Sequence, residues 1–161
     1  MNQSSNVPAF QMSLRAAVAA ALSVAVAQWW QLQFPIYAMI SAVVVTDLKA
    51  SETWKLGLPR LVGSIVGAVL GAMTCAFLRP NAWEAGLAIF AAMFLSHLLR
   101  LRNAAKVAGY VCGIVLLAFG ENPWDYALHR TAETALGIAM AMLVSVVPKL
   151  LQTDETGQQE S

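Results

Sequence analysis

Arg60, Arg130 and Glu133 are ionisable residues that border or lie within long apolar stretches of the sequence. A charged side chain at the centre of a bilayer costs about 2.5–3.5 kcal/mol on insertion scales, so such residues are candidates for function. We expect each arginine to begin an apolar helix, where its charge adds to the positive helix end and to unpaired backbone N–H groups. Together the two arginines could hold a carboxylate. Alone, either arginine also fits an interfacial anchor whose charge reaches water.

Glu133 follows Arg130 by three residues, a spacing that places both side chains on one face of a helix. If water reaches this carboxyl group, it could bind and release a proton and so couple transport to a proton gradient. The alternative is a structural ion pair with Arg130 that fixes the start of the helix. Asp47, at the end of an earlier apolar run, is a second candidate for proton coupling, or else an ordinary loop charge.

Several other residues carry groups suited to an organic anion. Lys106 begins an apolar run and forms a basic cluster with Arg100 and Arg102, which would concentrate anions at one mouth of the protein. The same cluster is also explained as a simple topology signal. Four further residues complete the candidate substrate-binding set: Tyr37, Tyr110, Ser64 and Thr134. A tyrosine offers a ring and a hydroxyl group to an aromatic acid, although membrane tyrosines often only pack.

Enzyme chemistry is not indicated. The two histidines are 32 residues apart, and Cys75 and Cys112 lie in apolar runs, so neither pair has the spacing of metal ligands. Nucleotide-binding loops and nucleophile motifs are also missing from the sequence. We therefore expect a protein that is not an enzyme and that binds no metal or cofactor.

Composition indicates a membrane protein. Of the 161 residues 58% are hydrophobic and 12% are charged, whereas soluble domains carry about 25% charged residues. Such a chain has no basic face for nucleic acid. Six apolar segments account for most of its length, at 14–32, 34–46, 61–78, 82–99, 104–119 and 126–147. We predict an all-α integral membrane bundle of six transmembrane helices over residues 14–151, with polar tails at 1–13 and 152–161.

The second and fifth segments are short. Thirteen residues, 34–46, make about 20 Å of helix, against a hydrocarbon thickness of about 30 Å. Short spans in corresponding positions of two halves point to discontinuous helices around a midplane site. Equally, each could be an ordinary span completed by polar residues at its ends.

Basic residues in the short loops predict the orientation. Eight fall on the side of the N-terminus: Arg15, Lys49, Lys55, Arg60, Arg100, Arg102, Lys106 and Lys149. Only Arg79 and Arg130 fall on the opposite side. We therefore expect a multi-pass protein with both termini in the cytoplasm.

An internal repeat appears when the chain is laid on itself at an offset of 70 residues. The offset pairs Trp54 with Trp124, Arg60 with Arg130, Ser64 with Thr134, Gly67 with Gly137, and Gly71 with Ala141. It predicts two repeats, at about 14–79 and 82–148, and three crossings per repeat would turn the second copy upside down, as in many secondary transporters. Chance similarity between apolar helices is the alternative, since small residues recur in membrane spans.

Small residues at four-residue spacing form a stripe on the third and sixth helices. The stripe comprises Gly63, Gly67 and Gly71, and then Gly137, Ala141 and Ser145. Residues four apart share a helix face, and small side chains let two helix backbones approach closely. We expect these two helices to cross at the centre of the bundle.

The run Arg60-Leu-Val-Gly-Ser-Ile-Val-Gly-Ala-Val-Leu-Gly71 resembles the R-x-x-G-[TS]-x-x-G-A-x-x-G signature of the fusaric acid resistance and aromatic acid exporter family, which is related to the plant aluminium-activated malate channels. Phe34-Pro-Ile-Tyr-Ala-Met-Ile is similar to the segment that opens that family's second helix. Arg130-Thr-Ala-Glu-Thr-Ala-Leu-Gly137 looks like the second-half counterpart. The resemblance covers about residues 14–147 and implies export of aromatic or other organic carboxylates across a bacterial inner membrane.

The better-known exporters of that family are longer, with a second membrane block or a soluble domain, whereas this chain ends ten residues after Leu151. We therefore expect two or more copies to assemble into a homo-oligomer in the bilayer. The leading hypothesis is an exporter of organic, aromatic carboxylates driven by the proton gradient. The alternatives are an anion channel with Arg60, Lys106 and Arg130 along its pore, and a membrane assembly partner that transports nothing.

Overall fold

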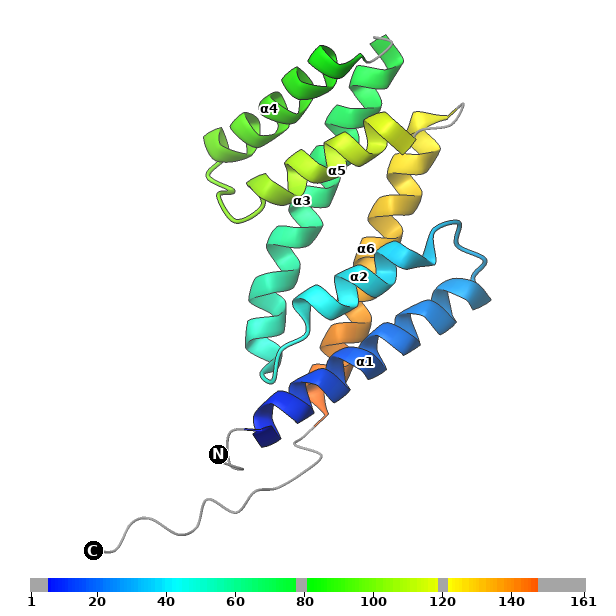
Figure 1. Ribbon diagram of the computed structural model, residues 1–161, viewed down its shortest axis with the longest axis vertical. Helices are drawn as coiled ribbons and strands as arrows, with labels where there is room; N and C mark the ends of the chain where they lie inside the picture. The colour runs from blue at the N-terminus through cyan, green and yellow to red at the C-terminus, as the bar shows by residue number, and fades with distance from the viewer. Residues whose placement is uncertain (1–5, 78–80, 119–121, 148–161) are drawn as a thin grey trace, which may run out of the picture.

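The computed structural model describes residues 6–77, 81–118 and 122–147, and these ranges fold into helices and their connections without a strand (Figure 1). The helices are α1 (Asn6–Trp29), α2 (Pro35–Val45), α3 (Ala50–Phe77), α4 (Ala82–Leu98), α5 (Ala105–Ala118) and α6 (Pro123–Val146). Two described stretches, Ala9–Trp29 and Ala50–Phe77, are long and apolar enough to cross a membrane. The apolar helices α2, α4 and α5 are shorter. The all-helical part of the prediction is confirmed.

Three helices begin earlier than the sequence predicted. The predicted polar tail at 1–13 is helical from Asn6 onward. Helix α3 begins at Ala50 and not near residue 61, because it continues through Pro59. Helix α6 begins at Pro123, and proline is well suited to a first helical position since its N–H would have no partner there.

These earlier starts change the surroundings of the two arginines. Arg60 lies ten residues after the start of α3, about 15 Å along its axis, and Arg130 lies seven residues after the start of α6, about 10 Å along. The prediction that both arginines begin their helices is therefore wrong, and the unpaired N–H groups of those first turns do not reach them. Neither arginine is a loop charge, so neither belongs in the count of loop charges that predicts orientation; Arg79 and Lys149 lie outside the described residues.

The short second and fifth helices are confirmed. Helix α2 has 11 residues and α5 has 14, so each is about half as long as the 24-residue α6 or the 28-residue α3. Gln31, with a φ of 54°, takes the left-handed conformation in the connection between α1 and α2. This turn lets α2 run back along α1.

The helices form two antiparallel pairs joined by the two long helices. Figure 1 shows α1 beside α2 at one end of the molecule and α4 beside α5 at the other, with α3 and α6 between them. Helix α3 packs mainly on α5 and α6, and α6 packs mainly on α3 and α2. The bundle is therefore built around α3 and α6, each of which carries the short helix of the other half.

The glycine stripes contact the short helices and not each other. A Cβ atom on Gly67 would collide with the backbone of Ala108 in α5, and one on Gly137 would collide with the backbone of Ala38 in α2. Gly63 and Gly71 likewise face α5. The two long helices also contact each other, as where Thr53 Oγ1 lies 2.8 Å from Oγ of Ser145, the last small residue of the α6 stripe. The expected contact between α3 and α6 is therefore present, but the glycines of the stripes pack against the short helices.

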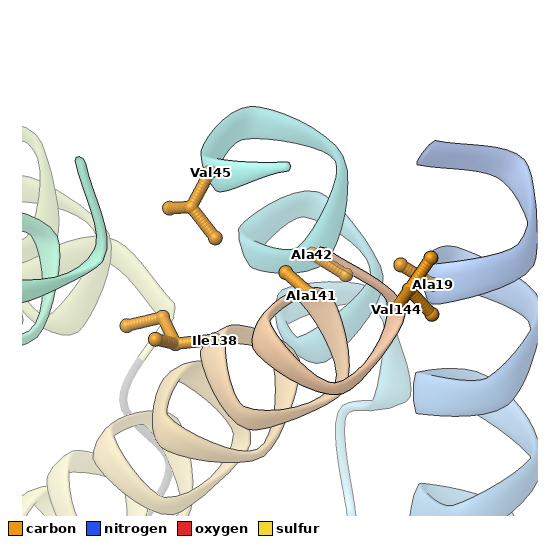
Figure 2. Packing of buried hydrophobic residues seen from close by; sticks show 6 residues of the cluster. All are labelled: Ala19, Ala42, Val45, Ile138, Ala141 and Val144. Atoms are coloured by element: carbon orange, nitrogen blue, oxygen red, sulfur yellow. The ribbon is translucent and has the colours of Figure 1, made fainter. Parts of the chain in front are cut away.

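Ala141 belongs to a packed cluster of α1, α2 and α6. It is fully buried with Ala19, Ala42 and Val45. Figure 2 shows Ala141 next to Ala42, and Val144 next to Ala19. Small residues on all three helices thus allow α6 to pack closely against α1 and α2.

A substitution tests the close contact between α3 and α5. Gly67→Ala should lower the free energy of unfolding by about 1–3 kcal/mol, because the added methyl group forces the two backbones apart. Gly86→Ala, in α4, is the matched control: its Cβ would meet nothing within 4 Å, so it should be neutral or slightly stabilising. Thermal unfolding in detergent measures both. Equal effects of the two changes would contradict the described packing.

Candidate anion-binding site

Arg130 is a buried cation. Only 4% of the residue is exposed, and its Cζ atom lies 3.4 Å from the centroid of the Tyr37 ring, which α2 places beneath it. The buried Nε and Nη1 atoms have no hydrogen-bond partner. A guanidinium stays protonated in proteins, and a buried charge without hydrogen bonds is costly. The aromatic ring compensates part of that cost, and two donors remain for an anion.

Aromatic residues enclose one side of this cation. The hydroxyl oxygens of Tyr37 and Tyr126 lie 2.6 Å apart and share a hydrogen bond. The Phe34 ring meets the Tyr126 ring edge to face at 5.0 Å between centroids. Tyr126 precedes Arg130 by four residues and therefore lies on the same face of α6. The cluster combines apolar ring surfaces with a positive charge. The rings could contact the ring of an aromatic carboxylate, and the charge could bind its carboxylate group.

Glu133 is fully buried one turn beyond Arg130. Its Oε1 atom accepts a hydrogen bond of 2.7 Å from the backbone N–H of Phe34, directly before α2, and its Oε2 atom has no partner. The predicted alternative of a direct ion pair with Arg130 is wrong. Among the described residues, one ion pair has a nitrogen–oxygen distance within 4.0 Å, and it joins Lys55 to Glu52.

Arg60 occupies the related position on α3. It is buried, its Nε donates a hydrogen bond of 3.1 Å to Ser41 Oγ, and its Cζ lies 6.0 Å from the centroid of the Tyr110 ring. Each of the two buried arginines therefore lies beside a tyrosine from a short helix.

The other predicted site residues are buried on their own helices or lie away from the cluster around Arg130. Thr134 Oγ1 donates to the carbonyl oxygen of Arg130 within its own helix, and Ser64 is buried on α3. Lys106 is exposed at the start of α5. Asp47 lies in the connection after α2, where its carbonyl oxygen accepts from Ser145. Ser145 is twelve residues, about 18 Å of helix, beyond Glu133, so Asp47 is not part of the cluster around Arg130.

A second positive region lies beside residues 58–62 of α3, the stretch that also contains Arg60. There a pocket lies between α3 and the connection from α4 to α5, and its lining residues are Leu58, Pro59, Val62, Arg100, Leu101, Arg102, Asn103 and Ala104. Two of the three predicted basic residues, Arg100 and Arg102, line it. Arg100 takes a left-handed conformation with a φ of 59° in this connection.

The sequence alone missed three contributors to the cluster. The spacing of Tyr126 from Arg130 was a usable signal, because four residues separate side chains on one helix face. Phe34 contributes through its backbone N–H and Ser41 through a contact across helices. Neither of these contacts has a signature in the order of residues.

The family fusaric acid resistance protein-like matches residues 20–144, which include the two arginines, Glu133 and both short helices. The chain belongs to this family. Family membership confirms the resemblance noted in the sequence.

Two curated relatives are similar to most of this chain. The chain is 26% identical over 151 residues to the uncharacterized transporter YdhK of Escherichia coli (strain K12), covering 86% of this chain and 22% of that protein. It is 22% identical over 130 residues to the UPF0421 protein YgaE of Bacillus subtilis (strain 168), covering 81% of this chain and 37% of that protein. The chain thus spans well under half of the length of these relatives. No solved structure matches it.

Proposed function

We propose that this protein exports organic carboxylates, aromatic ones in particular, across the bacterial inner membrane, using the proton gradient. The observation that carries the proposal is the buried guanidinium of Arg130, which lies over the Tyr37 ring with Nε and Nη1 unpartnered. Membership in a transport family and the name of the transporter YdhK support it.

The proposed substrate fits the donors and rings of the cluster. A carboxylate can accept charge-assisted N–H bonds from a guanidinium, which are shorter and stronger than hydrogen bonds between neutral groups. The substrate ring would then lie against Tyr37, Phe34 and Tyr126, whose faces and edges suit another aromatic ring. Arg60 adds positive charge without offering all of its donors, since one of them already binds Ser41.

We further propose that the six helices span the membrane as two inverted repeats. The 70-residue offset that pairs Gly67 with Gly137 also pairs Ala108 with Ala38, and these are the residues in contact: Gly67 with Ala108, and Gly137 with Ala38. The offset therefore relates contacts between helices, and not only residue types within two helices. The basic residues that do lie in connections, Lys49 between α2 and α3 and Arg100 and Arg102 between α4 and α5, support a cytoplasmic location for these two connections.

Labelling from each side of the membrane tests this arrangement. Trp54 and Trp124 are repeat partners near the starts of α3 and α6, and both are about half exposed. In a background without Cys75 and Cys112, Trp54→Cys should react with an impermeant maleimide only from the cytoplasmic side, and Trp124→Cys only from the periplasmic side. Reaction of both from one side would rule out inversion.

Transport itself is tested in vesicles of E. coli polar lipids that contain the purified protein. Export predicts efflux of radiolabelled benzoate that is faster when the side receiving benzoate is more acidic, while benzamide, the neutral analogue, shows no protein-dependent flux. Benzoate currents that persist without a pH gradient would instead indicate an anion channel. Equal flux in vesicles with and without protein would contradict the proposal.

A further inference from the structure

The two short helices are attached to their long partners in different ways. Helix α5 begins against α3 in direct backbone contact: a Cβ atom on Gly63 would lie 2.6 Å from the carbonyl oxygen of Ala104. Helix α2 begins beside α6 through a side chain, because the Glu133 carboxylate accepts the N–H of Phe34. At the first junction the contact is made by packing alone, whereas the second adds a hydrogen bond to an ionisable group to the ring contact of Phe34 with Tyr126.

These two junctions are repeat partners. The 70-residue offset pairs Gly63 with Glu133 and Ala104 with Phe34. At this position α3 carries Gly63, which allows direct backbone contact with the start of α5. The equivalent residue of α6 is Glu133, whose side chain binds the start of α2. The junction with the glutamate is the one from which α2 places Tyr37 next to Arg130.

We propose that Glu133 is a positioning residue that holds the start of α2 in place while it is ionised and releases it when it is protonated. A hydronium ion transfers its proton to a carboxylate oxygen and becomes water; Oε2, which has no hydrogen-bond partner, can receive the proton, and no other bond changes. The charge-assisted bond from Phe34 then becomes a weaker bond to a neutral acid. Since Tyr37 follows Phe34 by three residues, release of this segment also moves the ring beneath Arg130. The inference rests on the proposed transport function for one point: transport is the purpose that this movement would serve.

The charged and titratable groups on the helices around Arg130 and Glu133 leave Glu133 as the one to change charge. On α6 they are Arg130 and Tyr126; α2 contributes Tyr37, α3 contributes Arg60 and α5 contributes Tyr110. Helix α1 contributes Arg15, which binds Leu48 and Val147 at the other end of α6. Arginine stays protonated, and free tyrosine ionises near pH 10. Among the described residues of this cluster, the one carboxyl group is that of Glu133.

Cysteine labelling at the paired positions tests the proposal. In the background without Cys75 and Cys112, the full chain carries either Phe34→Cys or Ala104→Cys in vesicles of E. coli polar lipids. Reaction with a maleimide is measured at pH 8 and pH 6 and divided by the rate for the denatured protein, which removes the pH dependence of the thiol itself. Phe34→Cys should react about fivefold faster or more at pH 6, and Ala104→Cys should not change.

Adding Glu133→Gln supplies the second arm, because glutamine keeps the size of the side chain but cannot ionise. Phe34→Cys with Glu133→Gln should react fast at both pH values, as the protonated wild type does. An unchanged rate for Phe34→Cys between pH 8 and pH 6 overturns the proposal, as does a pH response that survives Glu133→Gln. Benzoate flux is measured separately, in vesicles that contain the parent protein without Cys75 and Cys112 and with Phe34 intact: pH-dependent labelling without flux would refute the transport function alone, and flux without pH-dependent labelling would refute the role of Glu133 alone.

Discussion

Arg130→Gln should reduce protein-dependent benzoate flux by about 30-fold or more. Removing one partner of a buried charge interaction costs about 2–5 kcal/mol, and each 1.4 kcal/mol corresponds to a factor of ten in binding. Glutamine cannot supply the charge or the N–H donors that Nε and Nη1 of Arg130 leave open. Arg130→Lys should recover part of the flux, since it keeps the charge but loses the planar guanidinium donors.

Lys55→Gln is the control for that experiment. Lys55 carries the same charge on α3 but lies on the surface, where its ammonium group pairs with Glu52 at 2.8 Å. Its removal should leave flux within about twofold of wild type, because exposed ion pairs contribute little. If Arg130→Gln transported benzoate as well as Lys55→Gln does, Arg130 would not be part of the binding site.

Arg15→Ala should lower the free energy of unfolding by about 2–3 kcal/mol, the second large effect that we expect. The sequence indicated only a topology charge at this position. In the structure the side chain is 4% exposed, and it donates 2.9 Å hydrogen bonds to the carbonyl oxygens of Leu48 and Val147. One side chain therefore ties α1 to the α2–α3 connection and to the end of α6.

Arg102→Ala is the matched control for Arg15, since it removes the same charge from an exposed position in the α4–α5 connection. Its effect on thermal unfolding should stay within about 0.5 kcal/mol. Similar losses for Arg15→Ala and Arg102→Ala would show that total charge, and not the buried hydrogen bonds, sets the stability.

Residue types and their spacing were sufficient to predict helices, because hydrophobicity and length are local properties. The short α2 and α5 followed from their apolar runs, and the family followed from the glycines after Arg60. Helix starts were less predictable. A proline commonly ends a helix, yet Pro59 lies inside α3 and Pro123 begins α6. Both arginines were misplaced relative to their helix ends for this reason.

Partners across helices could not be predicted from the sequence. The spacing of Arg130 and Glu133 is equally compatible with an ion pair and with two separate contacts, and the position of α2 decides between them. It brings the Tyr37 ring to Arg130 and the Phe34 N–H to Glu133. The glycine stripes were recognised as packing surfaces, but a stripe does not specify which helix covers it.

A crystal structure with p-iodobenzoate tests the central claim most directly, because anomalous scattering locates the iodine independently of the protein. The proposed site requires the carboxylate within hydrogen-bonding distance of Nε or Nη1 of Arg130, and the iodinated ring against the cluster of Tyr37, Phe34 and Tyr126. Iodine found only in the pocket lined by Arg100 and Arg102, with the Arg130 cluster unchanged, would contradict the assignment of Arg130 as the carboxylate-binding residue.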